Sequence, residues 1–328
     1  MRVGASVGLP LLVMELTGHL HFAVYAAFGA LTSLYGHSET VEGRLETQVV
    51  VGVALVATLV SAAFYSAAQG PEWLLLSMLA LTVVVAGTLG TVMGWVPRGE
   101  IFFILVLLVI AGIPLSASEI LPAIAAGAGG TAFSVLLTAV EGSTSLAPRS
   151  IALGIQRRMR MGSAALGVKR HATIITIACL AVTAAWALAR ALDIGHPFWA
   201  PIAVAALMPA LLPADALRRA VHLLAGTLGG VCIAAALFAQ EPTPLVLIAI
   251  IAACQGGAEL FIARNYAIAL LFITPLAIGM SNLGRNLPWS SLLIERLAEA
   301  LLGAVVALVA IFLGSALLAS AQRAERKA

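Results

Sequence analysis

Long apolar runs follow one another along almost the whole chain, and they constrain the fold more than any motif does. A helix that crosses a bilayer needs roughly 20 mostly apolar residues, with a range of about 17–25. Six such runs are expected in each half of the chain. They lie at about 3–17, 20–36, 47–67, 73–94, 101–115, 119–140, 172–192, 197–213, 220–239, 243–258, 265–281 and 293–319. The pattern predicts an all-α integral membrane protein with about 12 transmembrane helices and without a large soluble domain.

Composition agrees with this class. Apolar residues make up 61% of the chain and charged residues 10%, and the mean hydropathy is +1.05. Soluble domains are nearer 45–50% apolar and about 25% charged. The first run contains Glu15 and lacks a small-residue cleavage site, so we do not expect it to be a cleaved signal peptide. The three cysteines form no CxxC pair, and neither a disulfide framework nor a metal site is predicted.

Lys and Arg are distributed unevenly between the connections. With both termini on one side, 15 of the 18 basic residues fall on that side, and the other side keeps only Arg190, Arg285 and Arg296. Connections rich in Lys and Arg stay in the cytoplasm. We therefore expect a protein of the inner (cytoplasmic) membrane with both termini cytoplasmic.

Four parts follow from this reading. Residues 1–140 form a first six-helix repeat, 141–171 a basic cytoplasmic linker, 172–320 a second six-helix repeat and 321–328 a cytoplasmic tail. An amphipathic helix is expected over Ser150–Ala165 in the linker. Its basic residues serve either as a topology signal or as a site for anionic lipid headgroups or an acidic partner.

Matching positions suggest that the halves are copies. A shift of 174 residues superposes Arg44 on Arg218 and Tyr25 on Trp199. Glu119 precedes Gly127 by eight residues, as Glu295 precedes Gly303, and Arg98-Gly99-Glu100 stands where Arg264-Asn265-Tyr266 stands in the second half. Six spans per copy make the repeats parallel, and such halves usually enclose a solute path near mid-depth.

The segment from Arg264 to Pro275 is the first candidate for a solute site. Arg264 matches a carboxylate in geometry, and Asn265 and Tyr266 lie at a helix N-terminus that favours anions. Thr274-Pro275 predicts an interrupted helix near mid-membrane. The alternative is a cationic anchor with an interfacial tyrosine.

Further candidates for substrate contact are aromatic or cationic. Phe198 and Trp199, with His196 beside them, either stack an aromatic ring or form an aromatic belt at the outer surface. Arg44 and the adjacent pair Arg218 and Arg219 form an inner cationic vestibule, or are cytoplasmic for topology alone. Tyr25 is included as the repeat partner of Trp199.

Carboxylates inside spans are candidates for proton coupling or gating, because burial there costs about 2.5–3.5 kcal/mol. Glu15 lies deep in the first run and serves as a proton carrier, or it lies near the outer surface beside His19. Glu295, Arg296 and Glu299 fall on one turn, and they form either a gate or proton relay or an interfacial ion pair.

Three motifs together resemble the fusaric acid resistance (FUSC-like) family, within the aromatic acid exporter group. The motifs are Arg264-Asn265-Tyr266 with Phe272-Ile273-Thr274-Pro275, His196-Pro197-Phe198-Trp199-Ala200-Pro201 with the following arginines, and Arg296-x-x-Glu299-x-x-x-Gly303. The resemblance covers about 195–305, and it implies proton-driven efflux of small, often aromatic, carboxylic acids. Larger relatives carry a cytoplasmic helical domain for which this linker is too short.

We therefore expect an inner-membrane exporter of small organic anions, most favourably aromatic or lipophilic carboxylic acids, with protons as the coupling ion. No enzyme, cofactor, metal or nucleic-acid partner is expected; the partners are the solute, protons and membrane lipids. One alternative is a passive organic-anion channel, assembled as a homodimer, because cationic rings select anions. The other is a non-transporting membrane scaffold.

Overall fold

Helices make up the secondary structure of this computed structural model, which describes residues 2–97, 99–141, 148–209, 213–285 and 287–325, with the backbone alone for 2, 3 and 317–325. No strand occurs in those ranges. The prediction of an all-α chain is confirmed. In chain order the helices are α1 (Arg2–Leu16), η1 (Leu20–Phe22), α2 (Ala23–Ala30), η2 (Leu31–Leu34), α3 (Val41–Ala67), α4 (Glu72–Met93), α5 (Ile101–Ala111), η3 (Ala117–Glu119), α6 (Ile120–Glu141), α7 (Pro148–Ala165), α8 (Val168–Ala191), α9 (Trp199–Leu207), α10 (Pro213–Phe238), α11 (Pro244–Phe261), α12 (Tyr266–Asn282) and α13 (Trp289–Glu325).

Every apolar run in the sequence coincides with a helix, but the helices differ in length. By length and composition, seven of those described can cross a membrane: α3, α4, η3 with α6, α8, α10, α11 and α13. The other five runs hold shorter apolar helices, from the 8 residues of α2 to the 17 of α12. At 1.5 Å per residue these are about 12 to 26 Å long, less than the hydrocarbon core of about 30 Å. The chain is a membrane protein with seven candidate spans.

The predicted break at Thr274-Pro275 is absent, and that prediction is wrong. Helix α12 continues through Pro275 to Asn282. Proline removes one backbone donor from the helix, but neighbouring helices can hold a helix together around it in a membrane protein. Thr274 is fully buried and lies against Gly230 of α10, where a larger residue would collide with it. Packing against α10 therefore supports α12 at the point where the proline removes a backbone hydrogen bond.

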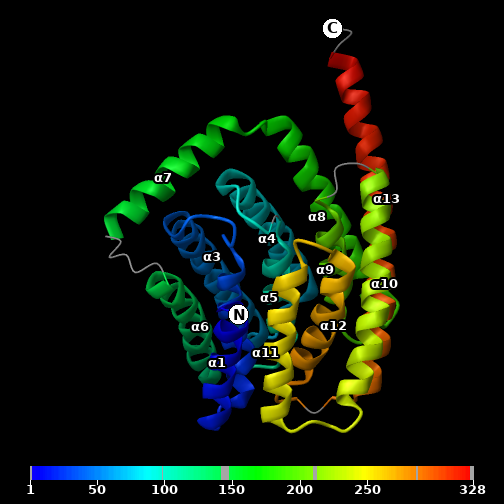
Figure 1. Cartoon of the computed structure of the whole chain (residues 1–328). Helices are drawn as coiled ribbons and strands as arrows, with labels where there is room; N and C mark the ends of the chain where they lie inside the picture. Colours follow the sequence, from blue (N-terminus) through cyan, green and yellow to red (C-terminus); the bar gives the residue numbers. More distant parts are fainter. Residues whose placement is uncertain (1, 98, 142–147, 210–212, 286, 326–328) are drawn as a thin grey trace.

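The helices form one bundle in which the two halves use corresponding contacts (Figure 1). Helix α6 packs on α2 and α3 in the first half, and α13 packs on α9 and α10 in the second. Helix α5 lies against α3 and α4, as α12 lies against α10 and α11. The halves meet where α1 contacts α11 and where α8 contacts α4. Small residues permit the closest approaches, since Gly127 and Gly130 of α6 lie against the backbone of α2 and Gly303 of α13 lies against that of α9.

Helix α7 is the amphipathic linker helix that the sequence predicts. It crosses one end of the bundle, and the C-terminal part of α13 projects from the same end (Figure 1). Arg158 fastens α7 to α3 by donating to Glu39 at 2.9 Å and to the hydroxyl of Thr47 at 2.9 Å, and it also donates to the carbonyl of Met93 at 2.8 Å. The other basic side chains of the linker are exposed.

Candidate functional site

A cavity of about 620 Å³ opens between the start of α10 and the connection from α11 to α12. Three arginines and one histidine line it against a single aspartate. The charged lining residues are Arg218, Arg219, His222, Arg264 and Asp215. The sequence predicted Arg218 and Arg264 as anion ligands, and the fold brings both to one cavity.

Arg219 is the best-placed cation in this cavity. Its guanidinium carbon lies 5.1 Å from the centre of the Tyr266 ring, within cation–π range. The Nε atom of Arg219 is buried and has no hydrogen-bond partner. Arg218, one residue earlier, points to solvent and faces Asp215 at 3.7 Å. A planar anion entering the cavity meets the guanidinium of Arg219 beside the aromatic face of Tyr266.

Asn265 and Tyr266 shape the floor of the same cavity. Asn265 Oδ1 accepts from the backbone N–H of Ala267 at 3.0 Å and of Ile268 at 3.2 Å, so this residue caps α12. Tyr266, the first residue of α12, is thereby turned toward Arg219. Arg264 precedes the cap and is exposed. The three predicted residues Arg264, Asn265 and Tyr266 thus all line the same cavity.

A second polar group is buried inside the bundle, between α9 and α13. Arg296 is 5% exposed and Glu299 is fully buried. The guanidinium of Arg296 lies 4.7 Å from the centre of the Trp199 ring, and Glu299 accepts from the backbone N–H of Ala200 at 2.9 Å. Arg296 Nε and Nη1 and Glu299 Oε1 have no hydrogen-bond partner. Polar atoms buried in that state are costly, which makes this group a functional candidate rather than a stabilising one.

Two threonine hydroxyls extend this pattern along the second half. Thr227 of α10 and Thr274 of α12 are both fully buried, and neither Oγ1 has a hydrogen-bond partner. Helices α10 and α12 also carry Arg219 and Tyr266, and α10 contacts α13, which carries Arg296. Unpaired polar atoms therefore occur on three mutually packed helices of the second half.

His196 and Glu295 form a pair beside this buried group. The imidazole Nδ1 contacts Glu295 Oε2, and both side chains are largely buried. The His196 ring also packs edge-on against Phe198, which lies against Trp199. The sequence assigned His196 to the substrate and Glu295 to gating, and the fold joins the two residues directly.

Three predicted residues lie outside these groups. Arg44 is engaged by the carbonyls of Gly36 and His37 and by Glu141 at 3.2 Å, so it braces the first half. Tyr25 is buried in α2 with an unpaired hydroxyl. Glu15 is the penultimate residue of α1 and partly exposed, so the prediction that it lies deep in a span is wrong. The predicted run extends to about residue 17 and α1 ends at Leu16, so Glu15 lies near the end of the helix.

Sequence reasoning missed His222 and Thr227 as site residues, and it did not separate Arg219 from Arg218. The signal was available for His222, which follows Arg219 by three residues and shares its helix face. Which of the two adjacent arginines turns inward depends on how α10 is rotated against α12. That rotation is set by packing at Gly226 and Gly230, which the composition of the helix does not reveal.

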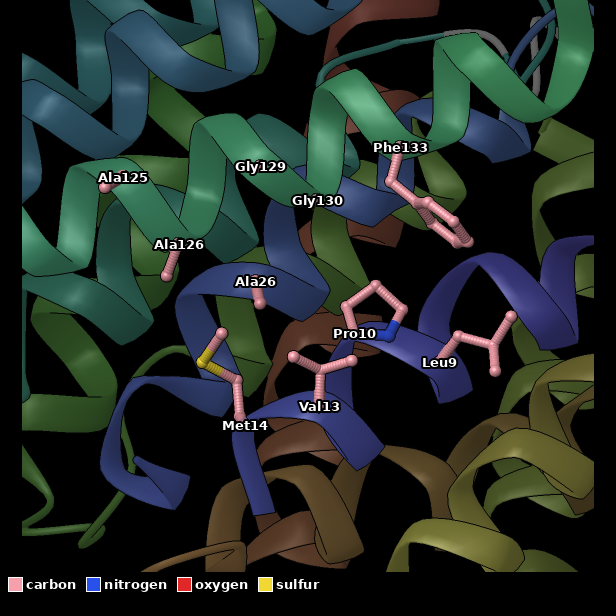
Figure 2. Close-up of a pocket in the computed structure, with 10 residues that line it drawn as sticks. All are labelled: Leu9, Pro10, Val13, Met14, Ala26, Ala125, Ala126, Gly129, Gly130 and Phe133. Carbon is pink, nitrogen blue, oxygen red and sulfur yellow. The ribbon is translucent and has the colours of Figure 1, made fainter. Parts of the chain in front are cut away.

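A separate groove of about 260 Å³ lies between α1, α2 and α6, and its lining is almost wholly apolar. Figure 2 shows Phe133 of α6 above Pro10 of α1, with Ala26 and Met14 to the left of them in this view. No charged side chain lines it. Its chemistry suits hydrocarbon and not an organic anion.

Comparison with known proteins finds a family match within the second half of the chain. Residues 180–310 match the family described as fusaric acid resistance protein-like. The predicted resemblance is confirmed for this part of the chain. An uncharacterized membrane protein of Bacillus subtilis (strain 168), YvaC, is 31% identical over 122 residues, which are 37% of this chain and 19% of that protein. The chain thus spans about a fifth of the length of the curated relative it matches. No solved structure matches.

Proposed function

We propose that this protein is a transporter that exports small organic anions across the inner membrane, in exchange for protons. Aromatic or lipophilic carboxylic acids are the solutes that its chemistry suits best. The observation that carries the proposal is the cationic cavity, in which Arg219 lies over the Tyr266 ring with an unpaired donor. The match to fusaric acid resistance protein-like proteins over residues 180–310 supports a transporter over an enzyme.

The cavity supplies the two contacts that an aromatic carboxylate needs. A guanidinium binds a carboxylate through two parallel N–H donors, and aromatic rings pack face to edge or offset against one another. Arg218 and Arg264 are exposed at the rim of the cavity, and their positive charge raises the local concentration of anions. Neither side chain has to break a buried contact in order to meet an anion. Arg219 and Tyr266 then select a planar solute.

Beyond the cavity, the solute path follows the unpaired polar atoms of the second half. Thr274 and Thr227 offer hydroxyl donors between α10 and α12. Arg296 and Trp199 repeat the combination of guanidinium and aromatic ring found at Arg219 and Tyr266. The solute therefore exchanges one cation–aromatic pair for a similar one, and His196 with Glu295 closes the far end. Glu299 carries protons in the opposite direction.

Parallel repeats account for the architecture. The corresponding contacts of α2 with α6 and α9 with α13, and of α3 with α5 and α10 with α12, support an internal duplication. On this proposal the shorter helices complete twelve segments, six per half. The cavity, α7 and both termini face the cytoplasm, as the distribution of Lys and Arg favours.

Reconstituted proteoliposomes test the transport proposal. An imposed pH gradient should move benzoate or a similar aromatic acid through the wild-type protein. Arg219→Ala should lower the rate by about 10- to 150-fold, because the loss of one charge-assisted contact costs roughly 1.5–3 kcal/mol. Arg149→Ala, which removes an exposed charge from α7, is the matched control and should transport normally. No movement by the wild-type protein, or equal rates for both variants, contradicts the proposal.

A passive anion channel is the second candidate, since a cationic mouth also selects anions. Planar-bilayer recording separates the two. Large anion currents that are independent of the pH gradient support the channel, and solute movement without such currents supports the exchanger.

A further inference from the structure

Glu100 is a buried carboxylate that takes no part in the proposed solute path. It lies in the connection from α4 to α5, outside the candidate spans, and immediately precedes α5. Only 6% of the residue is exposed. A buried carboxylate is normally paired with a cation or coordinated, because the charged form loses its hydration. None of the ion pairs in the described part of the chain involves Glu100.

The groups that surround Glu100 come from both halves of the molecule. Its Oε2 atom lies 3.5 Å from the point where a Cβ on Gly87 of α4 would stand. Its charge interacts with Tyr35, which is fully buried, and with Cys179 of α8. The next residue of α4, Thr88, hydrogen-bonds His171 of α8 at 3.0 Å. Glu100 therefore lies where α4 of the first half meets α8 of the second.

No described cation compensates this carboxylate. The groups that face it are the neutral phenol of Tyr35 and the thiol of Cys179, and His171 pairs with Thr88. Arg98, two residues earlier, lies outside the described residues. Burial raises the pKa of the Glu100 carboxyl from 4.5 to about 7, and a hydrogen bond from its own backbone opposes part of that rise. The N-terminus of α5 keeps the ionised form accessible.

We propose that Glu100 is a proton-binding site at the contact between the two halves, loaded and unloaded as they move; this inference rests on the proposed proton-coupled transport. The carboxylic acid releases its proton to water on the α7 side of the bundle and becomes a carboxylate, and it regains a proton when that contact closes again. Only the O–H bond breaks and forms. Helix α5 links this event to the solute path, because it packs against α9, which carries Trp199.

Infrared difference spectroscopy on the full chain in lipid nanodiscs measures the proton directly. Between about pH 5 and about pH 9, values that bracket an ordinary and a raised carboxyl, the wild-type protein should show a protonated-carboxyl band that disappears as the pH rises. In a Glu299→Gln background, which removes the other buried carboxyl that is assigned a proton, Glu100→Gln should lose this band, whereas Glu42→Gln, which changes an exposed carboxylate on α3, should keep it. Glu100→Asp keeps a carboxyl and should restore the band, so a folded control exists if the amide variant is unstable.

Transport by the same proteins tests the coupling. Glu100→Gln should still move the aromatic acid down its own gradient but should lose acceleration by a pH gradient, and Glu42→Gln should retain it. A titrating band that persists in Glu100→Gln within the Glu299→Gln background overturns the proton site, and full acceleration in Glu100→Gln alone overturns its role in coupling. Wild-type protein that moves no solute instead overturns the proposed function, and the coupling role with it.

Discussion

At the scale of single residues, Arg296 and Glu299 are the charged side chains with the most to lose from substitution. Both are buried, and each keeps unpaired atoms. Bringing two charges out of water costs several kcal/mol per ion, and the mutual attraction of the two offsets only part of it. Such a group is tolerated when a ligand or a conformational change completes it. The fold therefore buries polar atoms of Arg296 and Glu299 beside Trp199 without hydrogen-bond partners.

Removal of one member should expose the dependence between the two. Arg296→Met leaves the Glu299 charge without its cation and should lower the free energy of unfolding by about 3–5 kcal/mol. The double variant with Glu299→Gln should recover most of that loss. Thermal unfolding in detergent measures both, and Arg190→Met is the control, because its pair with Glu72 is exposed on both sides and should contribute at most about 1 kcal/mol. Equal losses at the two arginines contradict this expectation.

Stability should also depend on pH through Glu100. Its folded pKa, about 7, lies above the ordinary 4.5, so the folded protein holds a proton that the unfolded chain releases. The resulting stabilisation is fully present below pH 4.5 and is lost as the pH rises to about 7, by at most about 3 kcal/mol. Chemical unfolding at a series of pH values should show this fall in the wild-type protein. In Glu100→Gln that component should be missing, and an unchanged profile would refute the assignment.

At the scale of helices, glycines decide how closely the segments pack. A side chain on Gly130 of α6 would overlap the carbonyl oxygen of Ala26 in α2, whereas Gly129 has open space. Small residues at such contacts let helix backbones approach, which is a main source of helix association in membranes. Neighbouring glycines in one helix thus have opposite roles.

Alanine substitution should separate these roles. Gly130→Ala should destabilise the protein by about 1–3 kcal/mol because α2 and α6 must move apart. Gly129→Ala should be neutral or stabilising by up to about 1 kcal/mol, because alanine favours the helix. Parallel thermal unfolding of the two variants measures the difference, and a larger loss at Gly129 would show that the helices pack with another face.

Arg158 makes several polar contacts that hold the linker helix α7 on the bundle. Arg158 donates to Glu39 and to the carbonyl of Met93, while the adjacent Arg157 is exposed. Arg158→Ala should release α7 and make the linker at least several-fold more sensitive to limited proteolysis, since cleavage follows the opened population. Arg157→Ala removes the same charge and should digest like the wild-type protein. Similar digestion of both variants would mean that Arg158 does not hold α7.

At the scale of the whole molecule, corresponding contacts in the two halves define the arrangement. The first helix of each half packs on the fourth helix of the other, as α1 does on α11 and α8 does on α4. The halves are nevertheless unequal in chemistry, because the cationic cavity and the Arg296–Glu299 group both belong to the second. We therefore expect the second half to bind the solute, and Glu100 of the first half to bind a proton.

Thiol labelling tests the orientation of the whole bundle. In a background without the native cysteines, Ser163→Cys on α7 and Gln240→Cys in the connection from α10 to α11 are both exposed. A membrane-impermeant thiol reagent added to intact cells should label Cys introduced at 240 and not at 163, because Lys- and Arg-rich connections stay in the cytoplasm. The reverse pattern would invert the proposed orientation.

The sequence by itself was sufficient for the class of the protein and for the place of its apolar helices. Apolar runs of bilayer length specify helices because no other segment can satisfy its own backbone in lipid. The family resemblance was readable from motifs over about 195–305, which lie within the matched residues 180–310.

Tertiary structure alone decided which polar atoms meet. A run of apolar residues predicts a helix but not its rotation, so it could not separate Arg219 from Arg218, join His196 to Glu295, or place Glu100 at the contact between halves. The sequence also predicted a break at Pro275, but the effect of a proline depends on whether a neighbour such as α10 supports the helix. The differences in helix length also arise from tertiary packing, because a helix covered by other helices does not have to match the thickness of the bilayer. Those outcomes depend on packing between segments far apart in the chain, which no local pattern records.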